Sequence, residues 1–178
     1  MKYLRYKLVF IFFVLIISNH KVKAQNFSET QKLYSVVNIF KTSFYDSTKE
    51  QEFYDLFLHD SITWASVYEG KTKEFLKTKE DYQHFFSGNF MDFYEYLKRE
   101  GNCEEDFYNL VINVDNNHAT ISFEYTFKKK NEIQNWGKEY WTLLKVDGNW
   151  KIAAVLWTMN YQNIEKCPFV NNSYYNKF

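Results

Sequence analysis

The sequence predicts an α+β domain, in which helices from the first half of the chain cover one face of an antiparallel sheet from the second half. Apolar residues recur at every third or fourth position before residue 101 and at every second position after residue 107, a change from helical to strand periodicity. Short polar turns, of which Asp147-Gly148 is the clearest, separate the later segments. Helices segregated from such a sheet pack their apolar stripes on its apolar face.

Capping residues and one glycine predict four helices before residue 101. Capping boxes begin at Ser28 and at Ser47, where a Ser and a Gln or Glu three residues later satisfy free amides. Thr78 is expected to cap the third helix, and Gly101 to end the fourth. Their apolar faces are expected, helix by helix, to be Leu33, Val36, Val37, Phe40 and Phe44; Phe53, Leu56 and Phe57; Tyr82, Phe85 and Phe86; and Phe90, Phe93, Tyr94 and Leu97.

Five strands are expected, at 61–68, 108–114, 119–128, 136–146 and 150–161, the last four as an antiparallel meander. The alternation is cleanest in the strand over 119–128. One of its faces would be apolar, consisting of Ala119, Ile121, Phe123, Tyr125 and Phe127. The other would be polar, consisting of Thr120, Ser122, Glu124, Thr126 and Lys128. The tail after Cys167-Pro168 is expected to be loose.

The first 24 residues have the pattern of a removable signal peptide. Three basic residues among the first seven precede ten apolar residues at 8–17, and small residues lead to a cleavage site after Ala24. Ten apolar residues are too few to span a bilayer, which takes roughly 20. We therefore expect a signal peptide at 1–24, one domain at 25–165 and a tail at 166–178, in a bacterial protein exported to the periplasm or beyond. No second such run follows, so no membrane association is expected after cleavage.

Charge and motif content exclude several classes of partner. The full chain has 22 basic and 22 acidic residues, and the expected mature part keeps 17 basic against 22 acidic. This acidity disfavours nucleic acid and anionic membranes as partners. Arg99 is the only arginine left to form a bidentate phosphate clamp. The sequence has no zinc-ligand spacing, phosphate loop or calcium loop, so neither a metal nor a cofactor is expected.

Two cysteines, Cys103 and Cys167, lie in the expected mature domain. An exported protein can form a disulfide, and a bridge over this span would stabilise the fold by about 4 kcal/mol in the loop-entropy model. The spacing does not establish the pairing, so a bridge and two thiols both stay open.

The closing hairpin, Trp141 to Val155 (WTLLKVDGNWKIAAV), resembles the end signature of the nuclear transport factor 2-like superfamily. The segment Phe57 to Ile62 is similar to the exit of that family's second helix into its first strand. The resemblance extends over about residues 28–161, and the chain looks most like the exported SnoaL-like and lumazine-binding-like groups. It implies a cone-shaped, cystatin-like fold whose curved sheet and helices enclose a pocket for an apolar small molecule. Enzymes and non-enzymes share the fold, so the residues of the pocket decide the function.

Two activities that the resemblance implies lack their residues here. The ketosteroid-isomerase type needs a carboxylate near the end of the first strand, where this chain has Trp64, Ala65 and Ser66. It also needs a tyrosine in the first helix, and none lies in the matching part at 37–40. The epoxide-hydrolase type holds an arginine between two aspartates, whereas Arg99 lies at a polar helix end.

The remaining candidate acids and bases are few. His59 and His118 border strands and are expected in exposed turns. His84, on the predicted third helix, is the histidine that could point into a cavity, so it is the candidate catalytic residue. Glu69 is expected in a solvated turn, and Glu124 at solvent or in a dimer interface.

Three functions therefore stay open. The domain binds a small hydrophobic or aromatic molecule, or a protein partner, without catalysis. Alternatively it is an isomerase, dehydratase or cyclase that uses His84, or a homodimer that buries the sheet face of Thr120, Ser122 and Glu124. The expected ligand-binding residues are inward-leaning aromatic side chains: Trp64, Tyr82, Phe86, Phe123, Tyr125, Tyr140 and Trp157.

Overall fold

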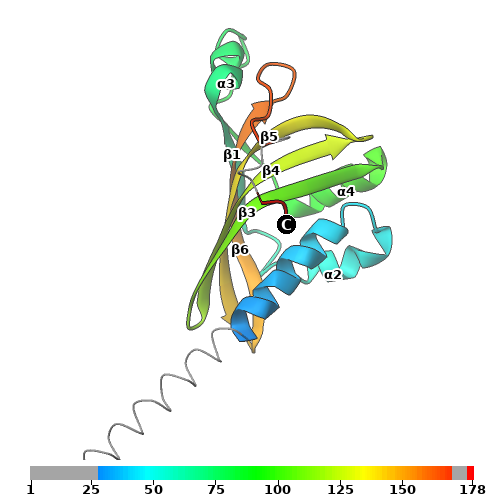
Figure 1. Ribbon diagram of the computed structural model, residues 1–178, viewed down its shortest axis with the longest axis vertical. Coiled ribbons are helices and arrows are strands. Elements are labelled where there is room, and N and C mark those ends of the chain that lie inside the picture. The colour runs from blue at the N-terminus through cyan, green and yellow to red at the C-terminus, as the bar shows by residue number, and fades with distance from the viewer. Residues whose placement is uncertain (1–27, 170–175) are drawn as a thin grey trace, which may run out of the picture.

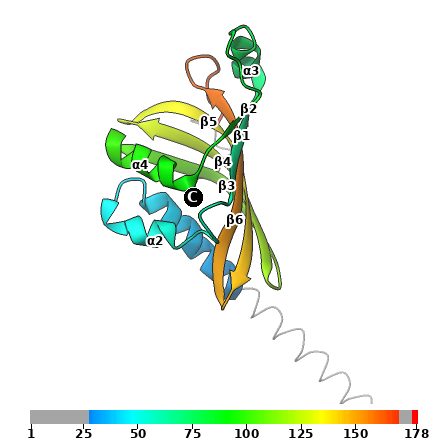
Figure 2. The same ribbon diagram turned by 180° about the vertical axis from the view of Figure 1, so that it is seen from behind.

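The computed structural model describes residues 28–169 and 176–178. The predicted signal peptide, 1–24, lies outside these residues. Helices and one six-stranded sheet form the α+β domain that the sequence predicts, and the open sheet curves around the helices (Figure 1, Figure 2). In the described part of the chain, no helix is both long and apolar enough to cross a bilayer.

The sheet has the strand order β2-β1-β6-β5-β4-β3. Its last four strands in sequence form the predicted antiparallel meander. β1 lies parallel to β6, and β2 pairs antiparallel with the other edge of β1. The strands are β1 (Thr63–Tyr68), β2 (Phe85–Ser87), β3 (Cys103–Asp115), β4 (His118–Lys129), β5 (Glu132–Val146) and β6 (Asn149–Tyr161).

The helices cover the face toward which the sheet curves, here called the inner face (Figure 1). A helix over residues 28–42, here called the N-terminal helix, crosses this face. α3 instead projects beyond one end of the sheet (Figure 2). The other helices are the 3-10 turn η1 (Ser47–Lys49), α2 (Glu50–Tyr54), α3 (Gly70–Leu76) and α4 (Phe90–Glu100).

Aromatic rings fill the space between the two layers. All five residues of the predicted apolar face of β4 are buried. Phe40 of the N-terminal helix packs on Trp141 of β5 with ring centroids 4.7 Å apart, and Phe107 lies 4.1 Å from Phe123. Such rings bury large apolar areas and interlock at offset or tilted angles. The inner face is therefore both the core of the domain and, where the rings leave room, the wall of a cavity.

Two predicted boundaries are confirmed by backbone geometry. Gly101 follows the last residue of α4 with a φ of +58°, in the left-handed region that favours glycine. Asp147 and Gly148 connect β5 to β6 with φ values of +49° and +82°. Positive φ at both central residues is what a two-residue hairpin turn with the right twist requires.

The predicted helix from Thr78 is wrong. α3 ends at Leu76, and Phe85–Ser87 form the short edge strand β2, in which Phe86 pairs with Ser66 of β1. Adjacent aromatic residues fit the apolar stripe of a helix as well as a short strand, so periodicity does not separate the two. By pairing with the open edge of β1, the segment satisfies backbone N–H and C=O groups of β1 that would otherwise have no strand partner.

Three smaller predictions also change. Asp46 rather than Ser47 caps the second helical segment, and its carboxylate accepts a hydrogen bond from the Thr48 amide at 3.1 Å. The end of the tail is not loose, because Phe178 stacks on Tyr34 at 5.6 Å and its amide donates to a β3 carbonyl. Cys103 is a buried thiol, 3.6 Å from the Gly101 carbonyl oxygen, so the considered bridge to Cys167 is not formed in this structure.

Candidate functional site

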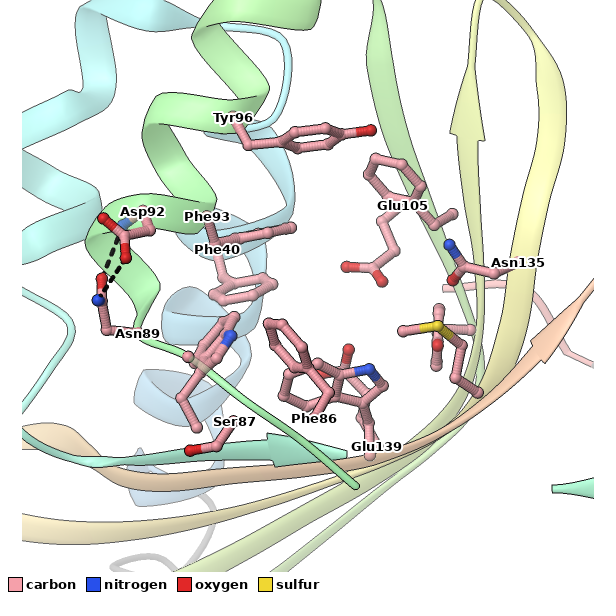
Figure 3. A pocket seen from close by; sticks show the side chains of 16 residues that line it. Phe40, Phe86, Ser87, Asn89, Asp92, Phe93, Tyr96, Glu105, Asn135 and Glu139 are labelled. Carbon is pink, nitrogen blue, oxygen red and sulfur yellow. Dashed lines mark hydrogen bonds between the residues drawn. The ribbon is translucent and has the colours of Figure 1, made fainter. Parts of the chain in front are cut away.

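A cavity of about 540 Å³ lies between the inner face of the sheet, the N-terminal helix and α4 (Figure 3). Most of its wall is aromatic or thioether, and six rings form the main surfaces. They are Phe40, Trp64, Phe86, Phe93, Phe127 and Trp157. Tyr96 and Tyr125 add rings with hydroxyl groups, and Met159 completes the apolar lining. A concave apolar site of this size can bury a small organic molecule.

The polar lining is sparse and concentrated in two places. Ser87, Asn89 and Asp92 lie where β2 leads into α4. The Asn89 side chain both accepts from the Asp92 amide and donates to the Asp92 carboxylate, each at 2.7 Å (Figure 3). Glu105 and Glu139 lie deeper, on the sheet, together with Asn135.

Sheet register explains how two glutamates reach an apolar cavity. Glu139 of β5 lies between Phe123 of β4 and Trp157 of β6, both of which face inward. Glu105 of β3 pairs with Phe127 of β4, another inward residue. Because directly paired residues point to the same face of a sheet, both carboxyl groups are directed to the inner face.

Burial changes the acidity of both glutamates. Burial raises the pKa of Glu139 to about 7, although the Trp141 indole, which donates to its Oε2 at 2.7 Å, favours the ionised form. Burial raises the pKa of Glu105 well above its ordinary value, and the charges of Glu139 and Asp106 raise it further. Both carboxyl groups therefore hold a proton to a higher pH than a free glutamate does, and the two titrate as a coupled pair.

Tyr125 is positioned by the lack of a side chain at Gly137. The two residues are paired neighbours on β4 and β5, and the Tyr125 hydroxyl donates to the Thr158 carbonyl of β6 at 3.1 Å. A Cβ added at Gly137 would lie 2.0 Å from that same carbonyl oxygen. The absence of a side chain at Gly137 thus lets the β6 backbone approach closely, and its Thr158 carbonyl accepts the hydrogen bond that fixes the Tyr125 ring in the cavity wall. Burial, with the nearby carboxylate charges, raises the pKa of Tyr125, so its hydroxyl stays protonated.

The structure brings together four of the seven residues predicted to bind a ligand. Trp64, Phe86, Tyr125 and Trp157 line the cavity. Phe123 is instead fully buried in the core, packed between Phe107 and Trp141. Tyr140 lies on the opposite, outer face of the sheet and is 48% exposed, and Tyr82 lies in the turn after α3.

His84 does not line the cavity. It is exposed in the segment between α3 and β2, and its nearest aromatic partner is Tyr82, with ring centroids 5.0 Å apart. The exposed positions of His59 and His118 match their prediction, and Glu124 is half-buried on the outer face, 3.7 Å from Lys138. No group of three or more metal-ligating side chains occurs among residues 28–169 and 176–178.

Sequence reasoning missed both cavity glutamates. Glu139 alternates in phase with the buried residues Trp141 and Leu143 of the same strand. An acidic residue at an inward position of that strand was the signal that could have identified it. Glu105 precedes the first strand residue that periodicity identified, and β3 begins earlier, at Cys103. Its inward direction therefore became visible only with the register of β3 against β4.

Comparisons with known proteins identify the fold. No family model matches this sequence, and no curated protein is detectably similar to it. A cystatin-like, nuclear transport factor 2-like protein from Novosphingobium aromaticivorans is similar in structure, with a TM-score of 0.57, 11% identity, and coverage of 80% of this chain and 88% of that one. A candidate scytalone dehydratase from the same organism has a TM-score of 0.53 at 16% identity, covering 78% and 88%.

A third similar structure is a Mycobacterium tuberculosis protein of unknown function. Its TM-score is 0.55 at 15% identity, and the match covers 84% of this chain and 83% of the other. At these identities the likeness shows the fold alone. The chain has the nuclear transport factor 2-like fold that its closing hairpin predicts.

Proposed function

We propose that this chain, a domain of nuclear transport factor 2-like fold, binds a small aromatic or apolar molecule in the cavity under α4. The supporting observation is the cavity itself: about 540 Å³ of space, walled by aromatic rings, inside a domain whose other rings pack closely. Interiors are normally packed without such voids. Apolar walls with a few convergent polar groups are the usual composition of a small-molecule site.

A neutral fluorescent probe tests this proposal. N-phenyl-1-naphthylamine should gain fluorescence on binding to the purified domain, and Phe86→Ala should weaken the binding several-fold. Phe86 lines the cavity but is 43% exposed on an edge strand, so its truncation should leave the fold intact. Phe85→Ala, which truncates the adjacent exposed phenylalanine of the same strand outside the cavity lining, is the matched control. Equal binding by both variants and the wild type would contradict the proposal.

A native ligand can be sought directly. Native mass spectrometry of the protein purified from its own host, before and after denaturation, should detect a released small molecule. Fractionation of the same cells tests the expected export, since the mature protein should be recovered outside the cytoplasm and begin after residue 24. Detection of the uncleaved chain in the cytoplasm alone would argue against export.

Acid–base catalysis is a second candidate function, favoured by the two buried glutamates. Glu139, whose pKa burial raises to about 7, can take a proton, while Glu105, whose pKa burial also raises, can in its protonated form donate a hydrogen bond to a developing oxyanion. This assignment replaces His84, which lies outside the cavity lining. One similar structure is described as a candidate scytalone dehydratase, and dehydration is a reaction that acid–base groups can catalyse.

Hydrogen exchange on an aryl ketone tests the catalytic candidate. In D₂O, a carboxylate base that removes an α-proton from bound 2-tetralone returns a deuteron, which NMR detects. The protein should accelerate this exchange, with a rate that increases as the pH rises through 7. Glu139→Gln should abolish the acceleration, and Glu132→Gln, at the exposed start of the same strand, should keep it. Exchange at the buffer rate would leave binding as the function.

The outer face of the sheet supports a homodimer as an additional proposal. One cross-strand row on this face runs through Val111, Ser122, Tyr140, Leu156 and Ala65. Three of these side chains, Val111, Tyr140 and Leu156, are apolar and 45% to 49% exposed. A row of exposed apolar side chains across an uncharged strip is typical of a self-association surface.

A further inference from the structure

We infer that the cavity selects an aromatic organic cation, a ligand that combines a ring with a protonated amine. The inference rests on the proposed ligand-binding function and names the chemical class of the ligand. Its main observation is the carboxyl group of Glu105, which is buried, directed into the cavity and without a hydrogen-bond donor from the described residues (Figure 3).

Glu105 is 6% exposed, and no hydrogen bond to its carboxyl group is formed by the part of the chain that the structure describes. Its partner Glu139 differs, since the Trp141 indole occupies one of the Glu139 oxygens. The Glu105 oxygens are not among the fully enclosed atoms without a partner, so they face the cavity, and a ligand that fills the cavity would exclude water from them. A ligand that donates hydrogen bonds would supply the partner that the protein does not.

The neighbouring residue on the same strand shows what Glu105 lacks. Asp106 points to the other face, where its two carboxylate oxygens contact Lys128 at 2.5 Å and Lys177 at 2.8 Å. Lys41, the basic residue whose charge most affects Glu105, donates instead to the Phe178 backbone carbonyl. These lysines form their hydrogen bonds elsewhere, and neither cavity glutamate forms an ion pair with a described residue.

The charged residues in the cavity lining are all acidic. They are Asp92, Glu105 and Glu139, and no lysine, arginine or histidine is present among the described lining residues. A bound anion would therefore face only like charge, and a neutral ligand would leave an ionised glutamate of the pair uncompensated. A single positive charge compensates one ionised carboxylate of the pair.

The aromatic walls fit the same ligand. Trp64 and Trp157 meet edge to face at 5.4 Å, and Phe86 lies 5.9 Å from Trp157, so ring faces and edges from three strands converge. A cation over a ring face is attracted by the π-electrons, and sites with several rings select substituted ammonium groups. The rings accept both parts of an aryl amine, and the carboxyl groups fix the position of its nitrogen.

Binding of a cation should be linked to proton release. Burial raises the pKa of Glu139 to about 7, so its carboxylate form, which a cation requires, increases about tenfold between pH 6 and pH 8. Other ionisable groups lie around this pair. The charges of Lys41 on the N-terminal helix and Asp106 on β3 act on Glu105, and Tyr125 on β4 interacts with both glutamates. Asp92 and Tyr96 of α4 line the same cavity.

Three ligands of similar shape and different charge test the inference: tryptamine, the neutral alcohol tryptophol and the anion indole-3-acetate. Isothermal titration calorimetry should give tryptamine a Kd at least tenfold below that of tryptophol at pH 8. The tryptamine Kd should fall about tenfold from pH 6 to pH 8. At pH 6.5, the observed heat should depend on the ionisation enthalpy of the buffer, as expected for a released proton. Indole-3-acetate should not bind.

Two variants separate the charge effect from the shape of the cavity. Glu139→Gln should remove the preference for tryptamine and its increase between pH 6 and pH 8, Glu105→Gln should reduce the preference, and both variants should keep the binding of tryptophol. Glu132→Gln, exposed on β5, should behave as the wild type. If tryptophol binds as tightly as tryptamine at pH 8, the inference is wrong and the proposed binding function stands. If neither indole nor the naphthylamine probe binds, both are wrong.

Discussion

Replacement of Glu139 by glutamine should stabilise the folded protein at alkaline pH. In the wild type, burial keeps the carboxyl group protonated until the pH reaches about 7, whereas in the unfolded chain it ionises near its ordinary pKa of 4.5. Between these two values the folded state binds one more proton than the unfolded state, so the free energy of unfolding falls as the pH rises. Glutamine keeps an acceptor for the Trp141 indole and has no proton to lose.

The magnitude follows from the difference between the two pKa values. At about 1.36 kcal/mol per pKa unit, an ionised Glu139 costs the folded state about 3 kcal/mol once the pH is well above 7. At pH 5 the folded carboxyl group is still protonated, and the cost is less than about 1 kcal/mol. We expect Glu139→Gln to exceed the wild type in stability by about 3 kcal/mol at pH 8.5 and to come close to it at pH 5.

Urea denaturation followed by tryptophan fluorescence, repeated from pH 5 to pH 9, measures this difference. Glu132→Gln, which changes an exposed carboxyl group of the same strand, should run parallel to the wild type at every pH. A constant difference between Glu139→Gln and the wild type across the range would refute the reasoning, because a merely structural effect of the substitution would not follow the titration. Unequal m-values would indicate a change in the unfolded state instead.

Three further predictions concern other parts of the domain. Gly137→Ala should lower the free energy of unfolding, measured by urea denaturation, by about 3 kcal/mol or more, because the added Cβ would clash with the Thr158 carbonyl oxygen. Near-normal stability would mean that β6 shifts freely. Glu29→Gln should cost about 1 to 3 kcal/mol at pH 7 and remove an acid transition. The lysine partners and the Trp150 indole lower the pKa of Glu29 to about 2, so its stabilisation is present above its ordinary pKa of 4.5 and lost as the pH falls toward 2. Tyr140→Lys should convert the proposed dimer to a monomer in light scattering, and a wild type that is already monomeric would overturn that proposal.

The sequence predicted best where a single rule acted alone. The strict alternation of β4 placed Phe123 and Tyr125 on the buried face, and the glycine at 101 ended α4 as expected. It failed in the segment from Thr78 to Ser87, where Phe85 and Phe86 satisfy a helical pattern. The open edge of β1 turns that segment into a strand, and no local pattern contains the position of that edge.

The candidate site divides in the same way. By itself, the sequence predicted an α+β domain with inward-facing aromatic residues, among them Trp64 and Trp157. Only the tertiary structure decided that Glu105 and Glu139 share a cavity with these rings, because strands distant along the chain place them there. Their raised pKa values likewise depend on burial and on each other's charge, which are properties of the folded arrangement.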